Sequence, residues 1–492
     1  MGTLKKLAGQ SAVYGLSSIV GRFLNYLLVP LHTNIFKQPG EYGVVTEIYA
    51  YISFLAIIYT YGLETSFFNF SRQEPFKEKI FSTVMTSVLT TTLLFSGTII
   101  YFSGSLADLM HYQKHPEYII WMAMIIGFDA LTAIPFAKLR QENKARKFAM
   151  LKLTNILINI GFNLLFFIIF PVWSKLDSGA GRILADTFYN PDIRVGYVFI
   201  SNLLASAITF FVMIPDIKFR FSEYDRALLG KVLLYSSPLL IAGLAGMVNE
   251  TLDRIMIKYL IPDTRDAMRQ LGIYGACYKL SILMTLFIQA FRYAAEPFFF
   301  SHFKGDDSKH VYARVMKYFV MACAFIFLFI MMYIDVFKYF IGKNYWEGLS
   351  VVPLLLVANM CLGVFFNLSM WYKLSGKTQY GAMFSVFGAV LTIALNLMLV
   401  PAMGYKGAAW ATLICYASMM VLSFIIGQKK FFIPYQTKRI LMIMIISVCL
   451  YLLSSFLKNI TGTQAGLVVN TLILGFFIYI LYKFEKPPLP WK

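Results

Sequence analysis

Long stretches without a charged residue recur along the whole chain. Examples run from Val84 to Leu106, from Ile440 to Leu457 and from Gly466 to Tyr482. About 20 consecutive apolar residues suffice for a helix to cross the hydrocarbon core of a bilayer. The pattern therefore predicts membrane-spanning helices rather than the amphipathic helices of a water-soluble core.

Fourteen such stretches can be placed, so we expect an all-α integral membrane protein with about fourteen transmembrane helices. The predicted spans are 10–33, 42–64, 81–103, 117–137, 148–170, 195–215, 232–260, 271–291, 311–333, 349–371, 379–400, 407–427, 440–457 and 464–482. An even number of spans places both termini on the same side of the membrane. The distribution of basic residues, described below, predicts that this side is the cytoplasm.

Weak similarity between the two halves predicts two lobes of six helices each, because transporters are often built from structural repeats. The matching positions are Gly43, Tyr49 and Ser71 against Gly272, Tyr278 and Ser301, and Asn163, Pro171 and Gly196 against Asn396, Pro401 and Gly407. We expect an N-lobe at 1–215, a cytoplasmic linker at 216–231 and a C-lobe at 232–427. An additional helix pair and a cytoplasmic tail follow at 428–492.

Composition supports the membrane assignment. The chain of 492 residues is 58% hydrophobic and only 14% charged, whereas soluble proteins contain about 25% charged residues. Its formal charge of +19 does not point to nucleic acid, because the basic excess lies in loops on one side of the predicted spans. The densest runs are at 138–147 and 429–439, and both are expected in the cytoplasm.

No motif indicates a cofactor, a metal site or a nucleotide site. All five cysteines fall inside predicted spans without paired or metal-like spacing, and the five histidines are scattered. The sequence has no phosphate-binding glycine loop, nucleophile elbow or catalytic dyad. We therefore expect no cofactor, no bound metal and no enzymatic activity.

Charged residues inside the predicted spans are the main functional signal, since a charge at the bilayer centre costs about 2.5–3.5 kcal/mol on insertion scales. The seventh span holds the densest group: Asn249, Glu250, Asp253, Arg254 and Lys258. At about 100° per residue its four charges cover about 140° of the helix, which makes one polar face. The eighth span adds Lys279. This face could bind a polar substrate, or its charges could merely neutralise one another.

Three further buried charges are candidates for function. Arg22 has no acidic residue in its own span, so it needs an anionic partner from another helix or from a substrate. Glu47 and Asp129 could bind a coupling ion or proton, or could pair with the basic residues. Glu64 and Lys152 lie near predicted span ends, where we expect them to extend to the membrane surface.

Together these features resemble the polysaccharide transport family of the multidrug, oligosaccharidyl-lipid and polysaccharide exporter superfamily, which includes bacterial O-antigen flippases. The residues that carry the resemblance are Pro30-Leu31, Glu41-Tyr42-Gly43, Gly62-Leu63, Phe70, Asp253-Arg254, Gly272-Ile273-Tyr274, Tyr278-Lys279-Leu280, Asn396, Pro401, Gly404 and Gly407-Ala408. They extend over almost the whole chain.

The resemblance implies a flippase in the bacterial inner membrane, working by alternating access through a cationic cavity between the lobes. It would move an undecaprenyl-diphosphate-linked oligosaccharide from the cytoplasmic to the periplasmic leaflet for surface polysaccharide biosynthesis. The diphosphate or acidic sugars would contact Arg22, Arg254, Lys258 and Lys279, with Asn249 on the same face. A proton, a sodium ion or the membrane potential would supply direction, with Glu47, Asp129, Glu250 and Asp253 as ion-coupling residues or charge partners.

Three other activities remain open at this point. A lipid II flippase of the same superfamily would have the same features. A multidrug exporter for cations would be expected to carry an acidic residue in place of Arg22 and usually has twelve spans. A membrane-embedded glycosyltransferase or polymerase would need catalytic residues on a sizeable external loop, and the longest loop, 171–194, is short for that purpose.

Overall fold

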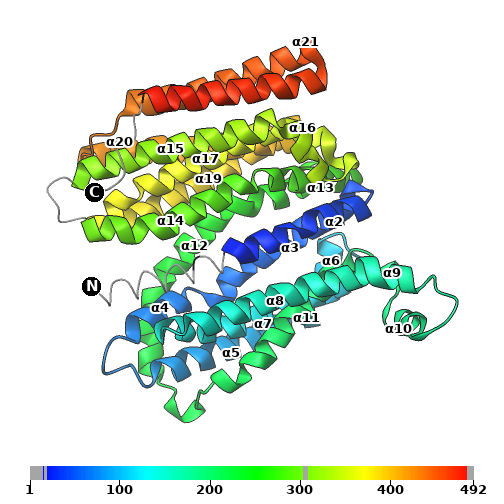
Figure 1. Ribbon diagram of the computed structural model, residues 1–492. Coiled ribbons are helices and arrows are strands. Elements are labelled where there is room, and N and C mark those ends of the chain that lie inside the picture. Colours follow the sequence, from blue (N-terminus) through cyan, green and yellow to red (C-terminus); the bar gives the residue numbers. More distant parts are fainter. Residues whose placement is uncertain (1–14, 16–18, 303–307, 485–492) are drawn as a thin grey trace. The chain divides into compact units, whose positions relative to one another are not determined.

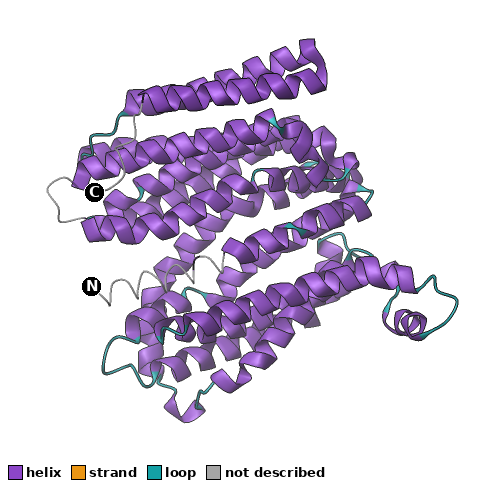
Figure 2. Cartoon of the chain, viewed as in Figure 1, coloured by secondary structure: helices purple, strands orange, loops and turns teal. Residues whose placement is uncertain are grey.

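The computed structural model describes residues 15, 19–302 and 308–484 (Figure 1). Within these residues every regular element is a helix (Figure 2). Twelve of the helices are long and apolar enough to cross a membrane. A thirteenth span results if α13 (Thr264–Leu280) and the part of α14 from Ile282 to Glu296, which are bent by 50° relative to each other, count as one.

The twelve helices coincide with twelve of the fourteen predicted spans, and the bent pair coincides with the eighth. The first predicted span, 10–33, lies partly outside the described residues. The sequence pattern did not show the break in the eighth span, which falls at Ser281 between the two helices. The count of fourteen and the cytoplasmic placement of the termini stay predictions.

By its internal contacts the chain divides into two compact units. Unit 1 comprises Met1–Phe36 and Gly40–Ile255, and unit 2 comprises Lys37–Pro39 and Met256–Lys492. The division falls inside one continuous helix, α12 (Arg226–Leu260). The lobes, the linker and the helix pair that we inferred from the sequence remain a prediction.

Unit 1 is built from long helices and short connecting helices. Its elements before α12 are α2 (Leu28–Ile35), α3 (Pro39–Thr60), α4 (Leu63–Phe70), α5 (Ile80–Tyr101), α6 (Ser103–Leu109), α7 (Glu117–Gln141), α8 (Ala145–Leu164), η1 (Leu165–Ile169), α9 (Phe170–Trp173), α10 (Ala180–Phe188), η2 (Pro191–Ile193), α11 (Gly196–Met213), η3 (Ile214–Asp216) and η4 (Phe221–Glu223). The helices α7 and α11 pack together, and each also packs against α8.

Unit 2 continues from α12 and α13. Its further elements are α14 (Ile282–His302), α15 (Ser308–Met332), α16 (Ile334–Phe337), η5 (Lys338–Phe340), η6 (Lys343–Val351), α17 (Val352–Leu368), α18 (Met370–Leu374), α19 (Gln379–Met403), α20 (Tyr405–Lys430) and α21 (Thr437–Phe484). The helices α17, α19 and α20 form its core, and α15 packs against α17 and α21.

The turn between α19 and α20 depends on two glycines. Gly404 has φ of +59°, a conformation that glycine adopts without the steric cost of a side chain. Three residues later, a Cβ on Gly407 would lie 2.2 Å from the carbonyl oxygen of Leu399. Both positions therefore require glycine for a backbone reason.

The C-terminal helix α21 doubles back on itself, so that its two halves run side by side (Figure 1). The hydroxyl of Ser454 donates to Oδ1 of Asn470 at 2.5 Å, which joins the two halves. The Asn470 amide donates to the carbonyl oxygen of Met332 at 2.6 Å. Because an unsatisfied buried amide is costly in an apolar environment, these bonds hold the doubled helix against α15.

An ion cluster also connects α21 to the rest of unit 2. Asp335 on α16 accepts a hydrogen bond from Lys338 at 2.8 Å and forms an ion pair with Lys458 of α21. Burial alone would raise the pKa of Asp335, but the two lysines outweigh it and hold the pKa below its usual value. The cluster therefore stays charged at neutral pH.

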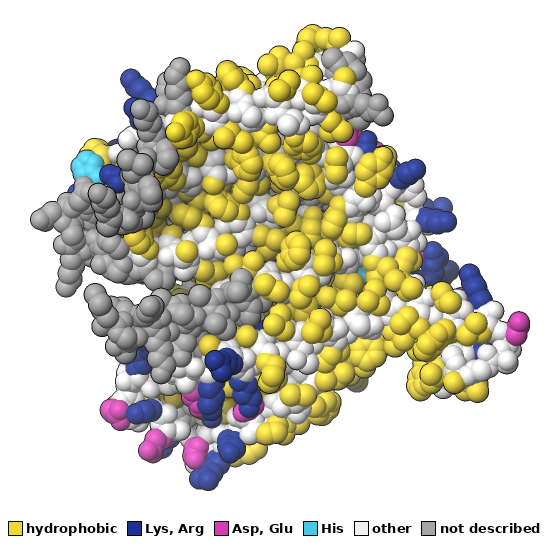
Figure 3. Space-filling view, viewed as in Figure 1, with side chains coloured by type: hydrophobic (Ala, Val, Ile, Leu, Met, Phe, Trp, Pro, Cys, Tyr) yellow, Lys and Arg dark blue, Asp and Glu magenta, His cyan; other side chains and the backbone are white. Residues whose placement is uncertain are grey.

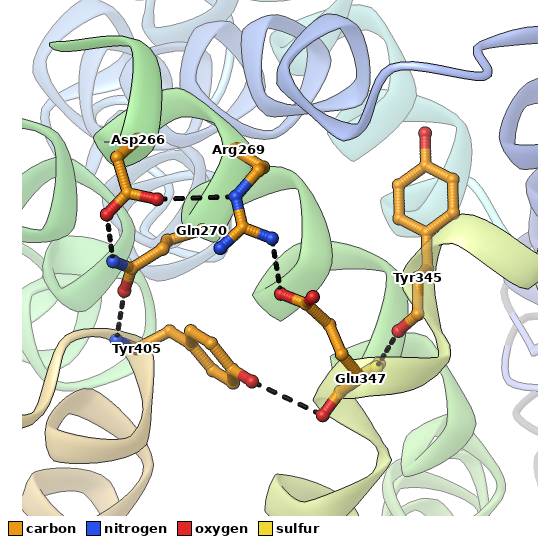
Figure 4. A network of polar contacts seen from close by, with 7 residues as sticks. Asp266, Arg269, Gln270, Tyr345, Glu347 and Tyr405 are labelled. Carbon is orange, nitrogen blue, oxygen red and sulfur yellow. Dashed lines mark hydrogen bonds and ion pairs between the residues drawn. The ribbon is translucent and has the colours of Figure 1, made fainter.

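A second polar network joins α13, η6 and α20 at one end of unit 2 (Figure 4). Arg269 contacts Asp266 at 3.3 Å and Glu347 at 2.6 Å. Gln270 donates to Asp266 at 2.6 Å, and its side-chain oxygen accepts the backbone N–H of Tyr405 at 3.0 Å. The side chains of α13 thus connect α13 to the middle of η6 and to the first residue of α20.

The surface agrees with a membrane location. Figure 3 shows hydrophobic side chains along the lengths of the helices, with most of the visible lysine, arginine, aspartate and glutamate side chains near helix ends. Many large apolar side chains point outward, among them Leu94, Leu234, Met398 and Leu472. In water such side chains would be unfavourable, whereas acyl chains solvate them.

Candidate functional site

A polar cavity of about 370 Å³ lies within unit 1. Four helices supply its walls: α4, α7, α8 and α11. The lining residues are Glu64, Asp129, Thr132, Ala133, Phe136, Arg140, Phe148, Lys152, Asn155, Asn202, Ser206 and Thr209. The cavity therefore gathers polar groups of membrane helices that would be costly to place against lipid.

Two of the four charges in the cavity neutralise each other. The guanidinium of Arg140 forms an ion pair with Glu64, whose side chain is 41% exposed. The same guanidinium lies 5.1 Å from the ring centroid of Phe68 and 5.7 Å from that of Phe148. Guanidinium groups favour aromatic faces, so Arg140 is held at the wall of the cavity by three partners.

The other two charges are Asp129 on α7 and Lys152 on α8. Oδ1 of Asp129 accepts a hydrogen bond from the hydroxyl of Ser206 at 2.7 Å. The ammonium nitrogen of Lys152 lies 4.2 Å from the ring centroid of Phe136. No ion pair joins Asp129 and Lys152 within the described part of the chain, so the two opposite charges share the cavity without direct contact.

Neutral polar side chains complete the lining. Nδ2 of Asn155 donates to Oγ1 of Thr209 at 2.9 Å, which connects α8 to α11. Nδ2 of Asn202 donates to the hydroxyl of Tyr49 at 3.0 Å, which connects α11 to α3. Asp129 of α7 and Asn155 of α8 therefore both bond to α11, and Asn202 joins α11 to α3, which fixes the geometry of the cavity.

A separate ladder of polar side chains runs between α2, the helical residues that precede it, and α8. Asn159 donates to Asn25 at 3.2 Å, Asn163 donates to Asn159 at 3.1 Å, and a ring nitrogen of His32 lies 2.8 Å from Oδ1 of Asn163. The π-helix η1 follows directly after α8 and places Phe167 edge-on against the ring of His32 at 5.6 Å. Asn159 and Asn163 of α8 therefore form one continuous row of polar contacts with Asn25 and His32.

The charges predicted for the seventh span lie on α12. Asp253, Arg254 and Lys258 are buried or nearly so: the side chains of Asp253 and Arg254 are 5% and 13% exposed, and Lys258 is 4% exposed. Arg254 donates to the carbonyl oxygen of Glu250 at 2.8 Å and lies 3.9 Å from Asp253. Glu250 itself is exposed and Asn249 is half-buried.

The remaining predicted residues lie on other elements. Arg22 is exposed and helical, and it does not contact Asp129 in the described structure. Lys279 is half-buried near the end of α13, two residues before the break at Ser281. Glu47 on α3 is fully buried and accepts a hydrogen bond from the hydroxyl of Tyr112.

We expected Lys152 to extend to the membrane surface, and this stays a prediction. The structure places its ammonium against the ring of Phe136, in the cavity that Asp129 also lines. Glu64 lines the same cavity through its ion pair with Arg140. The sequence did not indicate that Lys152, Glu64 and Asp129 line one cavity, because the packing of neighbouring helices sets the directions of these side chains.

Sequence reasoning also missed polar contacts at one end of unit 2. The guanidinium of Arg292 lies 4.0 Å from the ring centroid of Phe366. Lys373 contacts Glu296 at 2.5 Å. Both Arg292 and Glu296 are on α14 just beyond the predicted eighth span, which ended at residue 291. Because α14 extends beyond residue 291, Arg292 and Glu296 belong to the same helix as the end of the predicted eighth span. The sequence prediction had placed them outside it.

Unit 2 also contains an apolar cavity of about 210 Å³. Side chains of α15, α17, α20 and α21 form its walls, including Met316, Val364, Met420 and Leu441. The lining is almost free of polar atoms. Such a cavity suits an apolar chain.

The described residues include no group of three or more His, Cys, Asp or Glu side chains arranged to hold a metal ion.

Comparisons with known proteins identify the family of the chain and proteins that share its fold. A family described as polysaccharide biosynthesis protein matches residues 7–303, which is more than half of the chain. A solved structure described as the lipid II flippase MurJ, inward closed, has a TM-score of 0.66 at 17% identity and covers 96% of this chain and 99% of that one.

Multidrug resistance transporters of the MATE family of the MOP superfamily share the fold as well. An inward-facing structure has a TM-score of 0.62 at 14% identity over 85% of this chain and 94% of that chain. An outward-facing structure has a TM-score of 0.57 at 12% identity and covers 86% of this chain and 95% of that chain. No curated protein sequence matches. At these low identities the likeness concerns the fold alone.

Proposed function

Because the chain belongs to the polysaccharide biosynthesis protein family, we propose that it is a flippase for an undecaprenyl-diphosphate-linked oligosaccharide. The family match over residues 7–303 is the observation that carries the proposal. The helical membrane fold shared with a lipid II flippase and with MATE transporters supports it. The proposal assigns a transport step and no bond-forming step.

The proposed location is the bacterial inner membrane. The flippase would take the lipid-linked oligosaccharide from the cytoplasmic leaflet and release it in the periplasmic leaflet by alternating access. The oligosaccharide would then serve as a precursor of O-antigen or another surface polysaccharide. The excess of lysine and arginine in the loops on one side of the predicted spans supports the orientation with both termini in the cytoplasm.

Basic residues are proposed to bind the diphosphate. A diphosphate carries several anionic oxygens, and guanidinium groups bind such oxygens through two parallel hydrogen bonds. Arg254 is the strongest candidate because its guanidinium group lies on a membrane helix and its side chain is nearly buried, at 13% exposure. The others are Arg22, Lys258 and Lys279, together with the amide of Asn249.

The lipid part of the substrate needs an apolar environment. The apolar cavity of unit 2, lined by α15, α17, α20 and α21, offers one. An undecaprenyl chain is apolar along its length, so it can leave the acyl chains for an apolar wall of the protein at little cost. Membrane lipids would occupy the same kind of surface when the substrate is absent.

Flipping in one direction needs an energy source, and we propose an ion gradient. Carboxylates buried in a membrane protein are the usual ion or proton sites. Glu47, Asp129 and Asp253 are buried or line a cavity, and Glu250 lies one turn from Arg254. We retain these four as coupling residues or charge partners, with proton or sodium as the ion.

The second candidate function is flipping of lipid II itself. The similarity to the lipid II flippase structure, which extends over 96% of this chain, favours it over drug export. Both lipids carry an undecaprenyl diphosphate, so the basic residues would have the same role in either case. A multidrug exporter for cations is less compatible with basic residues such as Arg22 and Arg254 within membrane helices.

Binding measurements distinguish these functions. The purified full chain in nanodiscs should bind a fluorescent undecaprenyl-diphosphate oligosaccharide, and unlabelled undecaprenyl diphosphate should displace it because the diphosphate supplies the charged contacts. Lipid II carries the same diphosphate and should also compete, but with lower affinity than the unlabelled oligosaccharide lipid if surface polysaccharide is the substrate. Tighter binding of lipid II than of the oligosaccharide would favour the second function, and binding of a cationic dye such as ethidium alone would contradict both.

A further inference from the structure

We propose that the polar cavity of unit 1 is a proton-binding site, with Asp129 as the group that takes up the proton and Lys152 as its counter-charge. The inference rests on the proposed transport function, because it names the coupling ion of that transport. It selects one carboxylate among the candidates and adds Lys152, which the sequence alone did not suggest.

The charges around Asp129 determine what the cavity can bind. The titratable and charged groups that face it are Tyr49 from α3, Glu64 from α4, Arg140 from α7 and Lys152 from α8; α11 contributes only uncharged Asn202, Ser206 and Thr209. Glu64 and Arg140 form an ion pair and cancel. Asp129 and Lys152 are then the remaining pair, and the four charges sum to zero.

Asp129 and Lys152 are held apart by their own partners. Ser206 donates to Asp129 at 2.7 Å, and the ammonium of Lys152 lies against the face of Phe136 at 4.2 Å. A polar cavity of about 370 Å³ has room for several waters, since each occupies about 30 Å³ in the liquid. A proton can therefore reach the carboxylate through water without first breaking an ion pair.

The same arrangement disfavours sodium. A sodium ion needs several oxygen ligands around it, whereas the ammonium of Lys152 and the guanidinium of Arg140 in the cavity are donors only. A proton does not need a separate coordination shell, because it forms a covalent O–H bond to the carboxylate oxygen.

Protonation changes both charge and hydrogen bonding. When the Asp129 carboxylate takes up a proton it becomes a neutral carboxylic acid, and the charge of the cavity changes from 0 to +1. As a carboxylate, Asp129 accepts from Ser206 of α11; as an acid it also has an O–H to donate. The cavity walls are four separate helices, so the proton alters the forces between them. This links proton binding to the arrangement of unit 1.

Infrared difference spectroscopy of the purified chain tests the site without any substrate. A carboxylic-acid C=O band that titrates with pH should be present in the wild type and missing in Asp129→Asn. Lys152→Met should move this titration to higher pH, because the carboxylate loses its counter-charge. Asp186→Asn, which removes an exposed acid that is paired with Arg182 outside the membrane helices, should leave the band unchanged.

Translocation in proteoliposomes tests the coupling. A pH gradient should drive wild-type flipping in sodium-free buffer, and Asp129→Asn should reduce this driven flipping at least tenfold while substrate binding persists. A C=O band unaffected by Asp129→Asn, or flipping that requires a sodium gradient, would overturn the inference. A titrating Asp129 in a chain that flips no lipid-linked sugar would instead count against the proposed function and leave the proton site standing.

Discussion

Replacing Arg254 by alanine should lower translocation of a lipid-linked oligosaccharide about 10- to 100-fold while insertion into the membrane stays normal. Hydrogen bonds to charged groups contribute about 1.5–3 kcal/mol, and each 1.4 kcal/mol corresponds to a factor of ten. Arg254 is nearly buried on α12, and its contacts with Glu250 and Asp253 lie within the same helix. Flipping rates in proteoliposomes measure the effect.

Two further variants serve as controls. One tests whether the charge of Arg254 is sufficient without its planar guanidinium group, and the other tests whether loss of any arginine impairs the protein. Arg254→Lys keeps the charge but loses the planar donor pair, so it should recover only part of the activity. Arg265→Ala removes an exposed arginine at the start of α13 and should flip at the wild-type rate. Wild-type flipping by Arg254→Ala would show that this residue does not bind the diphosphate.

Gly407→Ala should destabilise the protein strongly although it adds only one methyl group. The new Cβ would lie 2.2 Å from the carbonyl oxygen and 2.5 Å from the carbonyl carbon of Leu399. These are backbone atoms of the preceding helix, so α19 and α20 must move apart. Overpacking of this kind costs about 1–3 kcal/mol, and the thermal unfolding midpoint in detergent should fall accordingly.

The matched control for this prediction is Gly475→Ala on α21. No atom lies within 4 Å of the Cβ position of Gly475, and alanine favours a helix over glycine by about 1 kcal/mol. Its midpoint should therefore stay equal or rise. Equal midpoints for the wild type and Gly407→Ala would mean that the turn at Gly404 tolerates a wider separation of α19 and α20.

The spans were predictable because one physical rule governs them. A membrane helix must be apolar for about 20 residues, so stretches such as Val84 to Leu106 can be recognised from the sequence alone. The break at Ser281 was not predictable, because both helices around it are apolar enough to pass as one span. The need for glycine at position 407 was likewise not predictable, because it depends on how closely the backbone of α19 approaches this residue.

The cavity of unit 1 could be predicted only in part. Asp129 was recognisable as a charge in the middle of an apolar span. Lys152 follows it by 23 positions on the next helix, and its direction toward Asp129 depends on how α7 and α8 pack. A pattern that could have helped is the spacing of Asn155, Asn159 and Asn163, which recur every fourth residue and therefore share one face of α8.

Movement of an undecaprenyl-diphosphate-linked oligosaccharide across a membrane by this chain can be measured directly. The most direct test places the purified full chain alone in liposomes loaded with this lipid, and measures how many head groups become accessible to a glycosidase that cannot cross the bilayer. We expect head groups of the inner leaflet to become accessible far faster in liposomes that contain the protein than in protein-free liposomes. Equal rates with and without the protein would contradict it.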